Sequence, residues 1–216
     1  MINPHFFSFD TFTFQVFMYI AIEINYESFN YSDRNACAVT AHGELWRWGI
    51  WNSKRLTPTQ FQGTLLDRHH VVSVALGDAH ILALTADGSV FSWLHIHVTQ
   101  ASIDRNWCAL CALEVSGHGE PRMSAIKSTK HLCSPRQIEA LAGERISHIF
   151  ADRHHSIVAG WTAGAGNAPV TSGQVTSAQR AYWSWGGPDT HDLLLGHGKN
   201  RYRACVPQRV MGIGPI

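Results

Sequence analysis

One short aromatic phrase occurs three times in the chain. The copies begin at residues 45, 90 and 182 and read LWRWG, VFSWL and YWSWG, each with a tryptophan two positions after another aromatic residue. Trp48 and Trp93 are 45 residues apart, whereas Trp93 and Trp185 are 92 apart, about twice that spacing. A phrase that returns at a fixed spacing indicates an array of like structural units, so it constrains the fold more than any other feature.

Three further phrases recur in a common order around these copies. They are TPTQF, SPRQI and VPQRV (57–61, 134–138, 206–210), VVSVALGDAH and RISHIFADRHH (71–80, 145–155), and VSGHGE and LLGHGK (115–120, 194–199). The shared order defines a unit of about 45 residues. Insertions at residues 95–114 and 162–180 lengthen the second copy, and the latter insertion, rich in Gly, Ser, Thr and Ala, is typical of a flexible loop at a hairpin tip.

Each unit has the pattern of short antiparallel strands. The runs VVSVAL (71–76) and HILALT (80–85) are apolar or alternating, and Asp87-Gly88 supplies a hairpin turn that His42-Gly43 repeats one unit earlier. The sequence therefore predicts an all-β fold, a partial β-propeller of roughly three blades with loop insertions, in which each repeated tryptophan packs between blades. The alternative is three unrelated hairpins in a sandwich, which the shared order of four phrases disfavours.

The N-terminal segment, residues 1–32, is rich in aromatic residues and matches no mark of the repeat, so residues 33–216 form the predicted partial propeller. Its longest uncharged run, Thr11 to Ile22, has 12 residues, whereas a membrane-spanning helix needs about 20. The alternation of aromatic and polar residues from Phe7 to Phe14 favours an irregular strand over a membrane anchor.

Charge and cysteine content limit the classes of partner and compartment. The formal net charge is +1, with 17 Lys and Arg against 16 Asp and Glu and no basic block. Such a chain has no electrostatic footprint for nucleic acid or for an anionic membrane, so neither is an expected partner. Five cysteines, an odd number, without a secretory leader predict reduced thiols in the cytoplasm or the nucleus.

The combined marks resemble the repeat of the regulator of chromosome condensation family over residues 33 to 212. The marks are Trp-x-Trp-Gly, Leu-Gly-His-Gly, Pro-x-x-Val, Gly-x-x-His and Leu-Thr-x-x-Gly, which stand here as Trp183, Trp185, Gly186, Leu195 to Gly198, Pro207, Val210, Gly77, His80, Leu84, Thr85 and Gly88. The resemblance implies a β-propeller, which has seven blades when complete. It also implies either nucleotide exchange on the small GTPase Ran or a binding module inside ubiquitin ligases and other scaffolds.

This chain departs from the family pattern in four respects. The first unit has no Leu-Gly-His-Gly after Gly49, Leu94 stands where the family has glycine, and Asp152 stands where Gly77 stands in the neighbouring copy. Only about three units are present, and three blades cannot close a ring without leaving strand edges exposed. We therefore expect a fragment, a divergent product, or a chain whose ring is completed by other material.

The repeated residues are predicted to be structural marks rather than a reactive site. The set is Trp48, Gly49, Gly77, His80, Gly88, Trp93, Gly117, Gly119, Pro135, His155, Trp185, Gly186, Gly196, Gly198 and Pro207. His80 and His155 recur in register, which favours a hydrogen bond inside each unit over metal binding. His118 and His197 each lie between glycines, where the imidazole is expected to bond neighbouring backbone.

One group of residues has a spacing close to that of a zinc site. Cys108 and Cys111 form C-x₂-C, and His131 and Cys133 form a second pair after 19 residues. The second pair is separated by one residue, whereas zinc ligand pairs are usually separated by two to four. Unliganded thiols are therefore the prediction, with zinc as the weaker alternative and a redox Cys-x-x-Cys, which lacks a βαβ context, weaker still.

No phosphate-binding loop, nucleophile elbow or HExxH motif is present, so the sequence predicts no catalytic residues and no cofactor. The function it favours is a non-catalytic protein–protein interaction module. The alternative is a guanine-nucleotide exchange factor for a Ran-like small GTPase, for which the 162–180 insertion is the long candidate loop. In both cases the expected partner is a protein, with no direct contact to nucleic acid or membrane.

Overall fold

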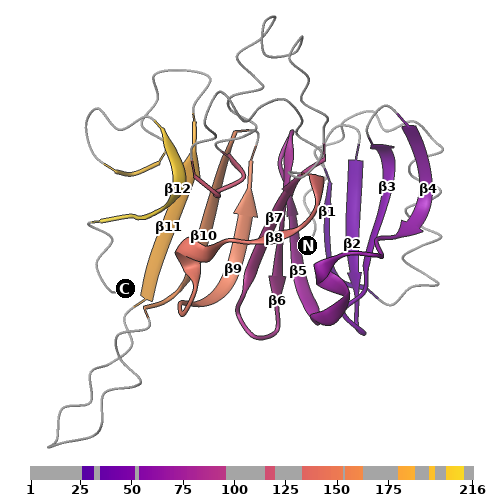
Figure 1. Ribbon diagram of the computed structural model, residues 1–216, viewed down its shortest axis with the longest axis horizontal. Coiled ribbons are helices and arrows are strands. Elements are labelled where there is room, and N and C mark those ends of the chain that lie inside the picture. Colours follow the sequence, from indigo (N-terminus) through magenta and orange to yellow (C-terminus); the bar gives the residue numbers. More distant parts are fainter. Residues whose placement is uncertain are drawn as a thin grey trace, which may run out of the picture.

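Three four-stranded antiparallel sheets make up the ordered part of the computed structural model (Figure 1). The structure describes residues 26–31, 35–51, 54–95, 115–119, 133–152, 154–162, 180–187, 195–197 and 203–211. The strands follow one another in space in the order in which they occur in the sequence, from β1 to β4, from β5 to β8 and from β9 to β12. Each repeat unit thus contributes one sheet.

The first sheet consists of β1 (Tyr26–Tyr31), β2 (Asn35–Thr40), β3 (Leu45–Trp51) and β4 (Lys54–Gln60). The second sheet consists of β5 (Val71–Leu76), β6 (His80–Thr85), β7 (Val90–Leu94) and β8 (Arg136–Gln137). The third sheet consists of β9 (Arg145–Ala151), β10 (His155–Trp161), β11 (Arg180–Gly186) and β12 (Ala204–Arg209). Two short 3₁₀ helices, η1 (Leu65–Arg68) and η4 (Glu139–Leu141), precede β5 and β9.

The sheets are arranged as successive blades of a partial β-propeller. The first strand of each sheet lies beside the next sheet, because β5 contacts β1 and β2, and β9 contacts β5 and β6 (Figure 1). Each sheet therefore packs against the next one near its first strands, so the three sheets follow one another as the blades of a propeller do. Two layers of a sandwich would not form such a series. This arrangement is the all-β fold that the repeat predicts.

One detail differs from the expected boundaries. β1 lies inside segment 1–32 and pairs with β2 through partners such as Phe29 and Ala38, so the boundary at residue 33 falls after the first strand of the first sheet. Most of both insertions, residues 96–114 and 163–179, lies outside the described residues, as do residues 1–25.

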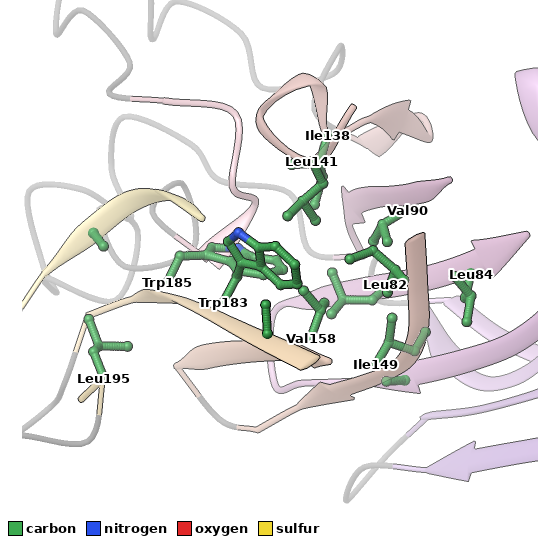
Figure 2. Packing of buried hydrophobic residues seen from close by; sticks show 14 residues of the cluster. Leu82, Leu84, Val90, Ile138, Leu141, Ile149, Val158, Trp183, Trp185 and Leu195 are labelled. Carbon is green, nitrogen blue, oxygen red and sulfur yellow. The ribbon is translucent and has the colours of Figure 1, made fainter. Parts of the chain in front are cut away.

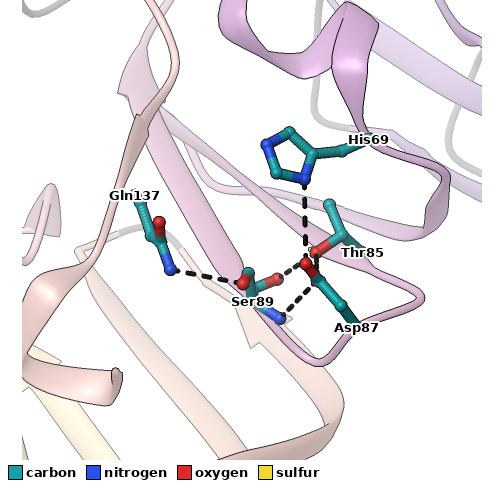
Figure 3. A network of polar contacts seen from close by, with 5 residues as sticks. All are labelled: His69, Thr85, Asp87, Ser89 and Gln137. Atoms are coloured by element: carbon teal, nitrogen blue, oxygen red, sulfur yellow. Dashed lines mark hydrogen bonds and ion pairs between the residues drawn. The ribbon is translucent and has the colours of Figure 1, made fainter. Parts of the chain in front are cut away.

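The β6–β7 turn shows why this stretch forms a hairpin. Gly88 has φ of +84°, a left-handed conformation that glycine adopts without steric cost. Thr85 Oγ1 donates to Asp87 Oδ1 at 2.5 Å, and the Ser89 amide donates to the same oxygen at 3.1 Å (Figure 3). These bonds hold the pKa of the Asp87 carboxyl below its usual value, with the Thr85 hydrogen bond as the largest cause. The hydrogen bonds of Asp87 within the turn therefore stabilise its conformation.

Two apolar cores join the sheets. One lies between the first and second sheets and contains Trp51, Ile81, Phe91 and Trp93. The other lies between the second and third sheets, where Trp183 and Trp185 pack with the residues labelled in Figure 2, which are Leu82, Leu84, Val90, Ile138, Leu141, Ile149, Val158 and Leu195. Alternate residues of each strand enter opposite cores, so the second sheet is buried on both faces. No helix among the described residues is long and apolar enough to cross a membrane.

Candidate interaction surface

A serine–histidine pair recurs in the second and third sheets. His118 Nε2 lies 2.9 Å from Ser92 Oγ, and His197 Nε2 lies 3.0 Å from Ser184 Oγ. Each serine hydroxyl also donates to a backbone carbonyl, that of Ser116 and that of Leu195 respectively. The Gly-His-Gly turn is therefore tied to the third strand of its own sheet. Each imidazole also contacts the backbone carbonyl of its serine, Ser92 or Ser184, which is distant from the histidine in sequence rather than neighbouring.

The first sheet replaces this pair with an arginine. Arg47 occupies the position of Ser92 and Ser184, and this unit has no Gly-His-Gly that would supply a histidine. Its guanidinium lies 4.6 Å from the ring centre of Phe61 and 5.4 Å from that of Trp51, so cation–π contacts take the place of the hydrogen bonds. Burial lowers the pKa of this guanidinium from its usual value.

His80 and His95 carry buried hydrogen bonds near the junction of the sheets. His80 Nε2 lies 2.7 Å from Ser156 Oγ on β10, so this bond connects two sheets rather than lying inside one unit. His95 Nδ1 accepts a hydrogen bond from the Asn35 side-chain amide at 3.2 Å, and His95 Nε2 donates to the Gly77 carbonyl at 3.0 Å. Burial is the main reason that the pKa values of both imidazoles are lowered, that of His80 to about 3.

Trp185 fills a socket that the second unit supplies. Its Nε1 donates to the Val115 carbonyl at 2.8 Å, and the side chain is completely buried. A Cβ atom on Gly117 would lie 2.7 Å from this Nε1 and 3.3 Å from Ile138 Cδ1, so only glycine leaves room for the indole. We call Val115, Gly117 and Ile138 the tryptophan socket.

The third unit has Gly196 and Val210 in the places of Gly117 and Ile138, and among the described residues no tryptophan lies within 4 Å of a Cβ built on Gly196. Gly196 has φ of +71°, close to the +75° of Gly117, and Val210 lies next to it as Ile138 lies next to Gly117. The amides of Val210 and Ile138 donate to equivalent carbonyls, those of Tyr182 and Val90, each at 2.8 Å. The third sheet thus has a copy of the socket at the end of the array.

The face of the third sheet that points away from the second sheet is apolar and accessible. Phe150 and Ile157 are cross-strand partners on this face, and so are Ala159 and Tyr182. Phe150 is 57% exposed, and the other three are half-buried. We call these four residues the outer face. An exposed aromatic side chain among partly accessible apolar neighbours marks a candidate interaction site.

The remaining repeat marks lie at turns, bulges and strand edges. Gly49 and Gly186 have positive φ, 103° and 115°, at the points where the pairing of the third and fourth strands shifts register. Pro135 and Pro207 are buried at the fourth strands. Trp48 and Trp93 are buried, and the Gly119 amide donates to the Cys205 carbonyl. His155 Nε2 lies 3.4 Å from Asp152 Oδ2. Gly198 lies outside the described residues.

Three of the four zinc candidates, Cys108, Cys111 and His131, lie outside the described residues. Cys133 is half-buried, and burial raises the pKa of its thiol. Among the described residues no group of three or more His, Cys, Asp or Glu side chains is placed to hold a metal ion. The zinc alternative therefore stays a prediction.

Residues 71–93, which form β5, β6 and β7, match the regulator of chromosome condensation (RCC1) repeat. One of the three sheets therefore contains a match to this repeat. It is 27% identical over 166 residues to the mitochondrial RCC1 domain-containing protein RUG3 of Arabidopsis thaliana, covering 74% of this chain and 28% of that protein. It is 28% identical over 188 residues to the human E3 ubiquitin-protein ligase HERC2, covering 83% of this chain and 3% of the ligase.

The crystal structure of human WBSCR16 has the same fold, with a TM-score of 0.53 at 19% sequence identity. The match covers 84% of this chain and 36% of that protein. This chain therefore spans well under two thirds of the length of each of these relatives.

One departure from the repeat pattern, Asp152 in the place of Gly77, has a physical reason. A Cβ on Gly77 would lie 2.4 Å from the His80 ring and 2.5 Å from the Asp152 carbonyl, so the close approach of the third sheet requires glycine there. Asp152 takes the equivalent place in the third sheet, where its side chain instead lies beside His155. Nothing in the described residues explains why Leu94 replaces the glycine that Gly186 provides.

The serines of the repeat were not among the predicted structural marks, although the sequence contains a signal for them. Ser92 and Ser184 occur in the two units that have Gly-His-Gly, and the first unit lacks both features together. That covariation within one chain indicates a contact. Ser156 has no such signal, because its partner His80 comes from a different unit and the equivalent position of the second sheet is Ile81.

Proposed function

We propose that this chain is a protein-interaction module that acts by binding rather than by catalysis, and that the outer face of its third sheet is the binding surface. The observation that carries the proposal is the exposure of apolar side chains there, above all Phe150 at 57%. Such a face gains free energy when a partner removes it from water, at about 25 cal/mol per Å² of apolar area.

The equivalent face of the second sheet supports this proposal. Its residues Ala75, Leu82, Leu84 and Val90 stand at the repeat positions of Phe150, Ile157, Ala159 and Tyr182. All four are at most 3% exposed, because the third sheet covers them. The outer face therefore continues an interface that already exists inside the molecule.

The chemistry of the partner follows from the same interface. The second unit receives Trp185 in the tryptophan socket, and the third unit presents the copy of that socket formed by Gly196 and Val210. The proposed partner is an antiparallel sheet that lays one face on the outer face and inserts a tryptophan beside Gly196. It belongs to another protein or to a longer chain that contains these repeats.

A photo-crosslinking experiment tests the proposal in native cells. Phe150 is replaced by the photo-reactive residue p-benzoylphenylalanine, and the matched control carries the same replacement at Ile50, which is 42% exposed on β3 of the first sheet. The proposal predicts a protein adduct at position 150 whose crosslinked peptide comes from a β-strand. Equal adducts at both positions, or none at position 150, contradict it.

The exchange-factor alternative stays a prediction, since residues 163–179 of its candidate loop lie outside the described residues. Stopped-flow release of a fluorescent guanine nucleotide from Ran tests it, and no acceleration at micromolar chain concentration would contradict it. The expected compartment, cytoplasm or nucleus, is likewise a prediction, because one matched relative is named as mitochondrial.

A further inference from the structure

A cavity of about 450 Å³ lies between the first and second sheets, away from the outer face. Its walls are the β2–β3 turn, represented by Glu44, and the loop of residues 60–71 that leads from β4 to β5. This loop is two residues longer than its counterpart in the next unit, since Phe61 and Val71 are ten positions apart and the equivalent Ile138 and Ile146 are eight apart.

The walls of the cavity are held in place by the protein itself. Asp67 Oδ2 accepts hydrogen bonds from the Gly63 amide at 2.7 Å and the Thr64 amide at 3.2 Å, while Thr64 Oγ1 caps the Leu66 amide. His69 is fixed from the other side, 3.8 Å from the Asp87 carboxylate (Figure 3) and 4.9 Å from the ring centre of Phe91. A ligand therefore meets a preformed site.

Apolar and acceptor groups face this cavity together. Leu45, Leu66 and Val71, nearly fully buried residues of the first core, line it and supply a small apolar floor. Most of its lining is polar and comes from the carboxylate residues Glu44 and Asp67, the amide residues Gln60 and Gln62, and the histidines His42 and His69. Among the described residues, none donates a hydrogen bond to Asp67 Oδ1 or to Gln62 Oε1, and no Lys or Arg lines the cavity.

We propose that this cavity binds an arginine side chain of a protein partner. The aliphatic part of an arginine is long enough to cover the apolar floor, and its guanidinium carries five donors and a fixed positive charge for the carboxylates of Glu44 and Asp67. A lysine offers three donors around a more strongly hydrated point charge and matches two carboxylates on opposite walls less well. The inference rests on the proposed protein-binding function, because the arginine belongs to a protein, but the cavity and the outer face are separate sites.

Glu44 and Asp67 are the acidic residues of the cavity lining. His42 and His69 line it together with the two carboxylates, and Arg68, which follows Asp67 in η1, is exposed outside the lining. Arg47 lies over Phe61 as described above. Glu44 is the wall residue that is best suited to substitution, because its side chain accepts only a long hydrogen bond, 3.4 Å from Thr40 Oγ1.

Titration with two small probes tests the proposal on the full chain. N-acetyl-arginine amide carries the guanidinium, and N-acetyl-citrulline amide has the same shape without the charge. Amide NMR shifts of Gly43, Gly63 and Leu66 report binding at the cavity. We expect the arginine probe to bind about fivefold more tightly than the citrulline probe, the usual worth of a partly exposed ion pair.

Two variants place the effect in the cavity. Glu44→Gln is expected to remove most of the preference for the arginine probe, while Glu139→Gln, an exposed change on the equivalent loop of the next junction, is expected to keep it. Equal affinity of the unchanged chain for both probes, or shifts that avoid these three amides, would overturn the proposal. Neither result depends on crosslinking at Phe150, so the two proposals fail separately.

Discussion

The Nε2 atom of His80 lies 2.7 Å from the Oγ atom of Ser156, and both side chains are completely buried. The bond joins β6 of the second sheet to β10 of the third. A hydrogen bond in this environment is costly to break, because neither group has water as an alternative partner. This hydrogen bond fixes the position of the third sheet relative to the second, whereas apolar packing alone would allow one sheet to shift along the other.

Replacing the serine tests that specificity. Ser156→Ala leaves His80 Nε2 buried without its partner and is expected to lower the free energy of unfolding by about 1–3 kcal/mol. Ser134→Ala, at an exposed serine, serves as the control and is expected to change it by less than about 0.5 kcal/mol. Urea unfolding followed by tryptophan fluorescence measures both, and equal effects would contradict the role of the bond.

The lowered pKa of His80 predicts a loss of stability in mild acid. Burial, the largest cause, and the neighbouring His95, His155 and His154 bring this pKa from 6.5 to about 3, so the folded chain keeps the imidazole neutral while the unfolded chain binds a proton below pH 6.5. Stability therefore falls as pH decreases through 6.5 and continues to fall toward 3, by about 2 kcal/mol between pH 7 and pH 5.

His95 and His118 have pKa values lowered in the same direction, mainly by burial, so the contribution of His80 must be isolated by difference. His80→Gln keeps a hydrogen-bonding side chain but cannot titrate. Its unfolding free energy is expected to change less between pH 7 and pH 5 than that of the unchanged chain. Identical pH dependence of the two proteins would show that His80 is not held neutral by the fold.

The tryptophan socket gives a matched pair of glycine substitutions. Gly117→Ala and Gly143→Ala both place a Cβ at positive φ, 75° and 85°, which costs about 1–2 kcal/mol in each case. Only at Gly117 does the new atom meet a neighbour, 2.7 Å from Trp185 Nε1, whereas nothing lies within 4 Å at Gly143. Gly117→Ala is therefore expected to cost about 1–3 kcal/mol more.

Chemical denaturation of the two variants measures this difference directly. Trp185 fluorescence is also expected to shift in the Gly117 variant, because its indole must leave the Val115 carbonyl. If both variants lose the same stability, the socket does not hold the indole as described.

The repeat predicts the architecture because each copy must form the same strands, and the four shared phrases place the turn at Gly88 and the buried tryptophans correctly. It does not predict contacts that differ between copies. Arg47 occupies the position of a serine and makes ring contacts instead, and Ser156 pairs with a histidine of the preceding sheet. The exposure of the outer face cannot be predicted from the sequence either, because an apolar residue such as Phe150 occurs at this position whether or not another sheet covers it. The cavity at Glu44 depends on a loop only two residues longer than its counterpart.

Hydroxyl-radical footprinting of the isolated chain and of the native complex tests the central claim most directly. The outer face predicts that Phe150 and Tyr182 are oxidised in the isolated chain and become protected in the complex, while Trp93 and Trp185, each at most 2% exposed, are protected in both. If Phe150 is oxidised to the same extent in the isolated chain and in the complex, the outer face is not the binding surface. If Trp185 is oxidised as readily as Phe150 in the isolated chain, the sheets are not packed as described.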